Sequence, residues 1–560
     1  MRTPRLVAAS VAALLAASLV ACAPALPATV VPGTEVTATW SGELTSLNAL
    51  ADPTPGNVDI AAVVRARFGD RVDGEFVPAP SFGTVEIVKD DPFTVRYDLA
   101  EPSWSDGVPL DAADLVLGWA SSVGLLADDG AFVDAPTPPR VDEFARSIDV
   151  TFPTPTILWQ TAVGAQVPAH VVGRIAFGLD DPMEAKQAVI RAVVDDDRAA
   201  LSKIAKAWRD GFTIGDAGDL DPALAISSGP FLVQSIERTD AGQSVVLTPN
   251  PGYRGTPTPQ VARVVLAPGG DDPIAHVGDT FGVVQAAPTA ADYPRVHELE
   301  RRDTQVQTPN DGRVWSLALR STGVFSSASA RAAFLRMAPA GDMIDRGAGQ
   351  WSSAYAKTTS MLALPGDRSY AVVAEDSGFA ASIGTPADDA AIDRGAAGVA
   401  AGTAVCVLYD QASEFAAGAF AALREGAAEA GWTVTDCGSG DVAASLAQGG
   451  WDAVIDRTVV PQTPAQLVAQ WGTGTTSAIA GAADPDRDAL ISQYAQTIDV
   501  YTARELLAQI EATIVRSAVV RPLATDPVLT LVAPGVTGVA VRNGSTAALT
   551  SGIAQWAVAR

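Results

Sequence analysis

The amino-terminal segment of this 560-residue chain constrains where it folds more than any other feature does. Met1 to Arg5 contains two arginines and no acidic residue, and Leu6 to Val20 forms an apolar run. That run is too short to span a bilayer comfortably, and a basic start before a short apolar run is typical of a secretory signal. We therefore expect the rest of the chain to fold outside the cytoplasm.

The signal ends in Leu19-Val20-Ala21-Cys22, which resembles the bacterial lipobox. The resemblance implies that residues 1–21 are removed, and that Cys22 is then acylated and anchors the chain to the bacterial cell membrane. Two or more acyl chains would make this attachment stable. Residues 22–34 are rich in Pro and Ala without periodicity, which predicts a tether. The alternative is an ordinary signal peptide that ends beside a cysteine by coincidence, and a periplasm and a cell-wall space both remain open as the compartment.

Length and charge narrow the class of protein. About 540 residues after the signal are too many for one core, so two or three compact units are expected. The formal net charge is −26, and it becomes −28 when Arg2 and Arg5 leave with the signal. Such a balance repels phosphate backbones, which argues against a nucleic-acid partner. No second apolar run downstream is long enough to span a bilayer, so the lipid is the expected anchor.

The remaining cysteines and the histidines are few. Once Cys22 is assigned to lipid, Cys406 and Cys437 remain as a pair in an oxidising compartment, which favours a disulfide. The two cysteines lie on neighbouring predicted strands, but their positions along those strands are offset by several residues. This offset disfavours a disulfide, so two free thiols remain an alternative. The three histidines are scattered and no Cys-x-x-Cys or His-x-x-x-His spacing accompanies them, so neither a metal site nor a cofactor is expected.

Local polarity patterns predict both strands and helices. In the first third of the chain, alternation predicts strands at 36–40 and 93–99, with a helix between them near 58–68. Asp111 is placed to cap a further helix, with Asp114 three residues on; the apolar face of that helix consists of Leu115, Val116 and Trp119.

The last third predicts a strand, helix and strand in succession. Strands at 405–409 and 432–436 flank a helix that Ser413 caps and Gly431 ends. A last long helix is expected to begin at Thr502 with Glu505 as its capping-box partner. The mixture predicts an α/β protein of mixed α+β character with more than one lobe.

One segment resembles a known family. The segment from Tyr97 to Trp119 contains Tyr97-Asp98-Leu99, then Trp104-Ser105-Asp106-Gly107, then the capped helix. This segment is similar to the signature of the solute-binding proteins of peptide-type ABC importers, extracellular family 5. Six further short matches follow in the family's order: Pro168-Ala169-His170-Val171, Ser228-Gly229-Pro230-Phe231, Asn250-Pro251-Gly252-Tyr253, Arg331-Ala332-Ala333-Phe334, Trp451-Asp452-Ala453-Val454 and Arg521-Pro522-Leu523.

The resemblance implies a two-lobed type II periplasmic-binding-protein fold of cluster C with a divided first lobe. We place the first lobe at 35–270 with a subdomain at about 51–164, the second lobe at 271–518, and a return to the first lobe at 519–560. The crossings between lobes are then expected near 265–280 and 510–525. Solute would bind in the cleft between the lobes, where pockets tend to form.

Most of the signature is expected to be scaffold, and the ligand contacts are expected at strand ends near the cleft. Asp106, Gly107, Asp111 and Asp114 are assigned to a turn and a helix cap. After the first strand, Trp40, Ser41 and Glu43 are candidate ligand contacts, because the family places this segment beside the solute. The alternative is a Trp40 packed within its own lobe. Trp315 lies on a strand that faces the cleft in the family and is a second aromatic candidate.

The strand that contains Trp451 to Ile455 departs from the peptide-binding members of the family. Those members continue with a Gly-Trp stretch and an aspartate that pairs with the peptide's α-ammonium, whereas this chain continues with Asp456-Arg457-Thr458. Asp456 is a candidate for that pairing, because a buried ammonium needs a paired charge. Arg457 is a candidate for a carboxylate, and the two side chains pairing with each other is the alternative.

The resemblance implies a monomeric receptor without catalytic activity that captures a solute, an oligopeptide above all, and delivers it to an ABC permease and its ATPase. A sugar or another non-peptide solute is one alternative, and a surface receptor or signalling lipoprotein without a transport role is another. The motifs that would favour a hydrolase are missing: the sequence contains no Gly-x-Ser-x-Gly, Ser-x-x-Lys or His-Glu-x-x-His.

Overall fold

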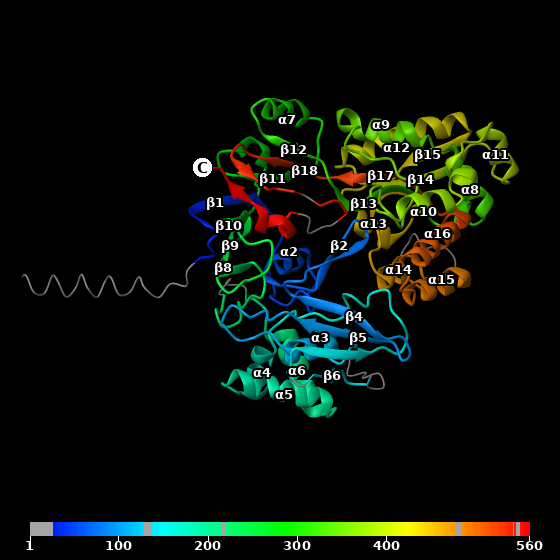
Figure 1. The fold of residues 1–560 in the computed structure, drawn as a ribbon. Helices are drawn as coiled ribbons and strands as arrows, with labels where there is room; N and C mark the ends of the chain where they lie inside the picture. Colours follow the sequence, from blue (N-terminus) through cyan, green and yellow to red (C-terminus); the bar gives the residue numbers. More distant parts are fainter. Residues whose placement is uncertain are drawn as a thin grey trace, which may run out of the picture.

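The computed structural model (Figure 1) describes residues 26–127, 137–142, 144–215, 220–475, 483–540, 542–544 and 549–559. The predicted signal and Cys22 lie outside these residues. Helices and strands are mixed along the whole chain, as predicted. Figure 1 shows three parts: a seven-stranded sheet, a five-stranded sheet beside it, and a smaller sheet with helices below both.

The seven-stranded sheet forms the centre of the first lobe. Its order is β12-β18-β11-β1-β10-β9-β8, with β1 parallel to β10 and Val36 opposite Val264. Val36 and Ala38 point into the core, which the alternating pattern of β1 predicts. The strands are β1 (Val31–Thr39), β8 (Phe231–Thr239), β9 (Gly242–Pro249), β10 (Val261–Ala267), β11 (Val283–Ala286), β12 (Gln305–Gln307) and β18 (Leu529–Val532).

A subdomain of the first lobe is inserted between β1 and β8. It contains a four-stranded sheet of order β4-β5-β7-β6, a hairpin and five helices. Its elements are α2 (Pro55–Val64), β2 (Gly69–Val72), β3 (Glu75–Pro78), β4 (Gly83–Lys89), β5 (Thr94–Leu99), α3 (Ala112–Ser122), β6 (Arg140–Val141), β7 (Ser147–Thr151), α4 (Ala169–Phe177), α5 (Pro182–Val194) and α6 (Arg198–Asp210).

The start of α3 carries a buried polar network. Asp111 caps the helix and forms a capping box with Asp114, as predicted. Asp114 also accepts hydrogen bonds from the Trp104 indole (3.2 Å) and from Lys186 Nζ (3.2 Å), and both charged side chains are essentially inaccessible to solvent. Asp111 and Asp114 therefore hold the start of α3, and Trp119 is buried in the core.

The second lobe is built on a five-stranded sheet of order β15-β14-β16-β13-β17. The predicted strand, helix and strand are present as β14, α12 and β15, with Ser413 as N-cap and Gly431 at a φ of 76°. The elements are β13 (Asn310–Leu319), α8 (Ala328–Met337), α9 (Ala340–Ala348), α10 (Tyr370–Asp376), α11 (Ala390–Ala396), β14 (Thr403–Tyr409), α12 (Glu414–Glu429), β15 (Trp432–Asp436), α13 (Val442–Gln448), β16 (Ala453–Val459), α14 (Pro464–Trp471), α15 (Pro485–Ala495), α16 (Val500–Ser517) and β17 (Val520–Pro527).

Strand pairing places the crossings between lobes later in the chain than the sequence predicts. β11 and β12 both pair with β18 in the first-lobe sheet, so residues 283–307 belong to the first lobe although a boundary at 270 was expected. β17 pairs with β13 in the second lobe as far as Pro527, beyond the predicted end at 518. The chain therefore crosses between β12 and β13 and again between β17 and β18. Helix α7 (Tyr293–Glu300) and the short strands β19 (Val536–Thr537) and β20 (Ala557–Val558) complete the α-helices and strands of the described residues.

Two predicted boundaries differ from the structure for local reasons. Val31 already pairs with Val261, so the first strand begins within the segment 22–34 that was predicted as a tether. Helix α16 begins at Val500 rather than at Thr502, because the side chain of Asp499 caps it by accepting a hydrogen bond from the Thr502 N–H.

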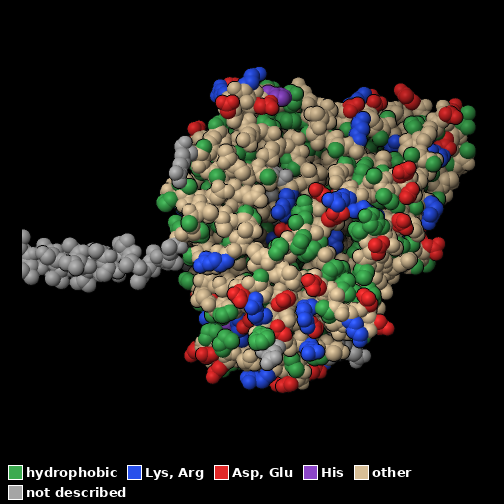
Figure 2. Space-filling view, in the orientation of Figure 1, with side chains coloured by type: hydrophobic (Ala, Val, Ile, Leu, Met, Phe, Trp, Pro, Cys, Tyr) green, Lys and Arg blue, Asp and Glu red, His purple; other side chains and the backbone are tan. Residues whose placement is uncertain are grey.

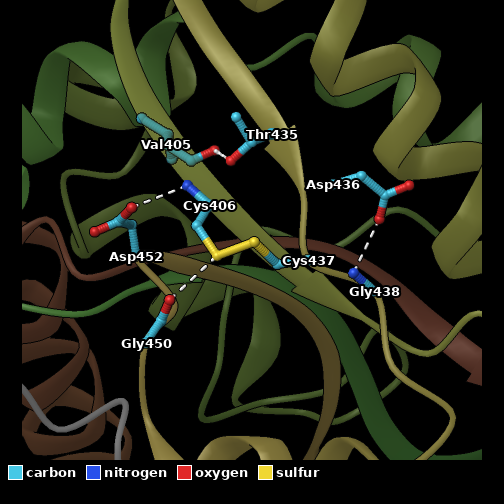
Figure 3. The surroundings of a disulfide bond; sticks show 8 residues. All are labelled: Val405, Cys406, Thr435, Asp436, Cys437, Gly438, Gly450 and Asp452. Carbon is cyan, nitrogen blue, oxygen red and sulfur yellow. Dashed lines mark hydrogen bonds between the residues drawn. A yellow bond between two sulfur atoms is a disulfide. The ribbon is translucent and has the colours of Figure 1, made fainter.

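Cys406 and Cys437 are joined by a disulfide (Figure 3). Cys406 lies opposite Thr435 in the β14–β15 pair, and Cys437 follows two residues later, on the same face of the sheet. The Cys437 N–H donates to the Val407 carbonyl, which keeps the chain beside β14 beyond the end of β15 and brings the two Cα atoms to 5.6 Å. The offset along the strands is therefore small enough for the bridge.

Candidate functional site

Two adjoining cavities lie between the lobes, each of about 350 Å³. Both are lined by Arg71, Asp73 and Gly74 of the first lobe and by Asp367 and Gln462 of the second. Their combined volume lies within the range of small-molecule sites. Figure 2 shows basic and acidic side chains spread over the face, including its middle, where the parts of the molecule meet.

The β2–β3 hairpin brings the first lobe to these cavities. Val72 pairs with Glu75, so Asp73 and Gly74 form a two-residue turn, with φ of 50° and 80°. An Asp-Gly pair is favoured in such a turn because both positions need positive φ. This hairpin was not predicted, although the Asp-Gly pair between two short runs is a signal for it.

Polar contacts from this part of the first lobe cross to the second lobe. The Glu75 carboxylate on β3 forms ion pairs with Arg368 (2.8 Å) and with Arg504 on α16 (2.7 Å). Nearby, the Ile157 N–H donates to the Ala495 carbonyl at the end of α15 (2.9 Å). The lobes are thus in direct contact beside the two cavities.

Three predicted site residues come together on the second-lobe sheet. Trp315 on β13 lies opposite Arg457 on β16, and Asp456 is the adjacent residue. The guanidinium carbon of Arg457 lies 5.7 Å from the Trp315 ring centroid. Both side chains donate to Asp526, the Trp315 indole to Oδ1 (2.8 Å) and Arg457 Nη1 to Oδ2 (2.8 Å). Asp526 was not predicted as a member of this cluster.

Asp456 and Arg457 do not pair through their side chains, which was one of the predicted alternatives. Only the backbone N–H of Arg457 donates to Asp456 Oδ1 (2.8 Å). Burial raises the pKa of Asp456, and the neighbouring guanidinium of Arg457 partly opposes that rise. Among the described residues, no basic side chain lies within ion-pair distance of the Asp456 carboxylate.

The Trp315 ring is enclosed by other aromatic rings. It stacks on Phe415 with centroids 4.6 Å apart, and Phe415 stacks on Tyr355 at 4.8 Å. Only 4% of Trp315 is accessible. Trp315 therefore forms a wall of the cluster rather than an exposed surface.

Trp40, Ser41 and Glu43 form a separate group within the first lobe. They follow β1 and line a cavity of about 830 Å³ together with the β8–β9 turn and residues 268–271. Glu43 lies 3.6 Å from Arg238, and Ser41 is exposed. No residue of the second lobe is among those that line this cavity. The first-lobe and second-lobe candidates thus do not meet in this structure.

Trp40 itself is packed in its own lobe, with 6% of its surface accessible. Its indole donates to Asp59 Oδ2 (2.9 Å). Burial raises the pKa of Asp59 to about 6, and the hydrogen bond from Trp40 opposes that rise. This buried position corresponds to the alternative for Trp40, packing within its own lobe.

Among the described residues, no three or more His, Cys, Asp or Glu side chains form a group that could hold a metal ion. Within the same part of the chain, no helix combines the length and the apolar character needed to cross a membrane.

Comparison with solved structures decides the fold. The periplasmic EDTA-binding protein EppA superposes with a TM-score of 0.77 at 18% identity, over 96% of this chain and 98% of EppA. The chain has the type II periplasmic-binding-protein fold. The substrate-binding protein CtaP of Listeria monocytogenes matches with a TM-score of 0.70 at 16% identity, over 94% of this chain and all of CtaP. The oligopeptide-binding protein AppA of Bacillus subtilis, solved with a nonapeptide, matches with a TM-score of 0.62 at 11% identity over 94% of this chain and 99% of AppA.

Comparison of sequences finds lipoproteins. An uncharacterized lipoprotein of Mycobacterium tuberculosis is 26% identical over 211 residues, which cover 36% of this chain and 36% of the relative. One of Mycobacterium leprae is 24% identical over 291 residues, or 50% of this chain and 48% of the relative. The match thus spans between about a third and a half of the relatives' length. No family model matches the chain.

Proposed function

We propose that this chain is an extracytoplasmic, lipid-anchored receptor that captures a small solute, an oligopeptide above all, between its lobes and delivers it to an ABC importer. The observation that carries the proposal is the pair of cavities that both lobes line in a fold shared with solute-binding proteins. Hinge closure of the lobes around the solute would let the membrane subunits distinguish loaded from empty receptor. The receptor itself would bind without catalysis, and ATP hydrolysis would belong to the importer's other subunits.

The second-lobe cluster supplies groups suited to a peptide. The Asp456 carboxylate has no side-chain partner among the described residues and is assigned to an α-ammonium. Arg457 and Trp315 are assigned to positioning the solute beside it, and the exposed Ser41 and Glu43 to contacts from the first lobe. These assignments require the lobes to move relative to each other, because the two groups are apart in this conformation and neither lines the two interlobe cavities.

A non-peptide solute is the second candidate. Two observations favour it: the segment after β16 lacks the Gly-Trp stretch of peptide-binding members, and EppA, which superposes over nearly the whole chain, is a binder of EDTA.

Native mass spectrometry of the exported protein from its own host tests the proposed function. We expect bound molecules that denaturation releases as a heterogeneous set of peptides, and Asp456→Asn should retain about tenfold less of them because the ammonium loses its counter-charge. A single non-peptide mass supports the second candidate. Protein that carries no solute, and takes up none from a culture filtrate, contradicts capture of a solute.

Cys22→Ser should release the chain from membranes after export, because acylation of Cys22 is the expected attachment. Fractionation of cells with and without the substitution, followed by immunoblotting, measures the effect. A substitution of the neighbouring Ala23→Ser serves as control and should leave the protein in the membrane fraction. Continued membrane attachment of the Cys22→Ser protein contradicts the lipid anchor.

A further inference from the structure

The two interlobe cavities are rich in arginine although the chain is strongly acidic. The net charge of the whole chain is −26, yet the cavity walls contain six arginines and four carboxylates. The arginines are Arg65, Arg67, Arg71, Arg368, Arg504 and Arg542. The site therefore has an excess of positive charge within a negatively charged surface.

Four of these arginines share two of the carboxylates. Arg67 (3.0 Å) and Arg542 (3.4 Å) both lie at Asp70. Arg368 and Arg504 both lie at Glu75. A carboxylate shared by two cations neutralises only one of them, so these pairs reduce the positive charge of the cavity without removing it.

Arg71 is the member that both cavities share. Its Nη1 donates to the Gly74 carbonyl (3.3 Å) and its Nη2 to the Ile157 carbonyl (3.4 Å), and both are long hydrogen bonds. Its Nε is buried without a hydrogen-bond partner. Within the described part of the chain, no carboxylate lies within ion-pair distance of Arg71. A guanidinium has five N–H donors, so most of the hydrogen-bonding capacity of Arg71 is unused.

The positive charge of Arg71 acts across the boundary between the lobes. Tyr494 on α15 of the second lobe lines the second cavity with Arg71. Burial raises the pKa of the Tyr494 phenol, and the charge of Arg71 opposes that rise. The guanidinium thus faces a space that both lobes enclose.

We infer that the captured solute is anionic and that Arg71 binds its carboxylate or phosphate group at the junction of the two cavities. The inference rests on the proposed function and adds the chemical class of the solute. A planar guanidinium matches both oxyanions in a bidentate geometry, and partial burial strengthens such a pair relative to water. The carbonyls of Gly74 and Ile157 hold the side chain in place, so little conformational freedom is lost when the anion binds.

The experiment uses the solute that the exported, detergent-solubilised full chain carries. Four proteins are compared: wild type, Arg71→Gln, Arg71→Lys, and Arg302→Gln, which removes one positive charge from an exposed position outside both cavities. Molecules released by denaturation are identified by mass spectrometry and counted per protein molecule. The wild-type extract is then returned to emptied protein untreated, methyl-esterified, or treated with phosphatase, and retention is measured by native mass spectrometry.

We expect the released solute to contain a carboxylate or phosphate and Arg71→Gln to retain about tenfold less of it. Arg71→Lys should retain an intermediate amount, because it keeps the charge without the planar fork. Arg302→Gln should behave as wild type. Loss of binding after esterification identifies a carboxylate, and loss after phosphatase identifies a phosphate.

Two results overturn the inference while leaving capture of a solute intact. One is a released solute without any anionic group, and the other is equal retention by wild type and both Arg71 variants. A wild-type protein that carries and binds no solute contradicts the proposed function as well. Circular dichroism of each variant shows whether it is folded. If Arg71→Gln does not fold, Arg71→Lys still tests the inference.

Discussion

We expect Asp114→Ala to lower the free energy of unfolding by about 3 to 5 kcal/mol, the range for removing one partner of a buried ion pair. Asp114 accepts hydrogen bonds from the Trp104 indole, from the Ala169 N–H (2.8 Å) and from the Asp111 N–H (3.0 Å). It also neutralises Lys186, which is only 1% accessible and keeps Asp111 (3.0 Å) as its remaining carboxylate. The substitution therefore leaves three donors unpaired and one buried charge half-compensated.

Urea unfolding followed by circular dichroism measures this loss as a lower denaturation midpoint. Asp210→Ala is the matched control in the same lobe, because it removes an aspartate whose partner Lys206 is an exposed residue. The control should leave the midpoint unchanged, since exposed ion pairs contribute little. Equal midpoints for the two variants would contradict a stabilising role of the Asp114 network.

The elements that the sequence predicted well are those with local signals. The cap at Asp111, the cap at Ser413 and the turn at Gly431 each depend on residues within one helical turn, and all three are present. The disulfide depends on only two neighbouring strands. A local pattern is sufficient here because the hydrogen bonds that end a helix are made by adjacent residues.

The boundaries between lobes depend on pairing between distant segments. β12 is joined to the first-lobe sheet by β18, which lies more than 220 residues further along the chain, and β11 lies between β18 and the distant strand β1. Strands of three or four residues carry too little polarity pattern to specify a partner. The sequence-based boundaries followed the family resemblance instead, and strand pairing moved both crossings.

The residues of the candidate site could be predicted only in part from the sequence. Trp315 and Asp456 were proposed from the resemblance, and strand register places them together, but Asp526 comes from β17 and no local signal links it to them. Arg71 carries no motif. Its position at both cavities depends on the hairpin turn and on how the two lobes meet. The amino-acid sequence alone does not show that Asp70 and Glu75 are each shared by two arginines, or that the Arg71 guanidinium has no carboxylate partner.

The burial of Glu511 could likewise not be predicted from the sequence, because this residue occurs within an ordinary amphipathic helix. The structure buries it under the segment 360–362, where it accepts hydrogen bonds from the Ser360 hydroxyl (2.7 Å), the Met361 N–H and the Leu362 N–H (3.0 Å). Leu362 and Leu364 line the interlobe cavities, so Glu511 holds part of the wall of the proposed solute site.

The protonation of Glu511 should make the stability of the protein fall between about pH 4.5 and pH 7. Burial raises the pKa of Glu511 from 4.5 to about 7. Below pH 4.5 the carboxyl is protonated in both folded and unfolded chains; between the two pKa values only the unfolded chain releases the proton, so unfolding becomes more favourable as pH rises. The full penalty, about 3 kcal/mol, is reached above pH 7. Glu511→Gln keeps a neutral acceptor and should abolish this component.

Thermal unfolding of wild type and Glu511→Gln at half-unit steps from pH 4 to pH 8.5 isolates this component, because titration of other groups, Asp59 among them, is common to both proteins. We expect the melting temperature of the variant to exceed that of wild type at pH 8 and to approach it at pH 4.5. Glu505→Gln, an exposed position on the same helix α16, should follow wild type throughout. A constant difference between wild type and Glu511→Gln across the pH range would mean that the Glu511 pKa is unchanged by folding, and that the 360–362 segment is held by an ionised carboxylate instead of a neutral one.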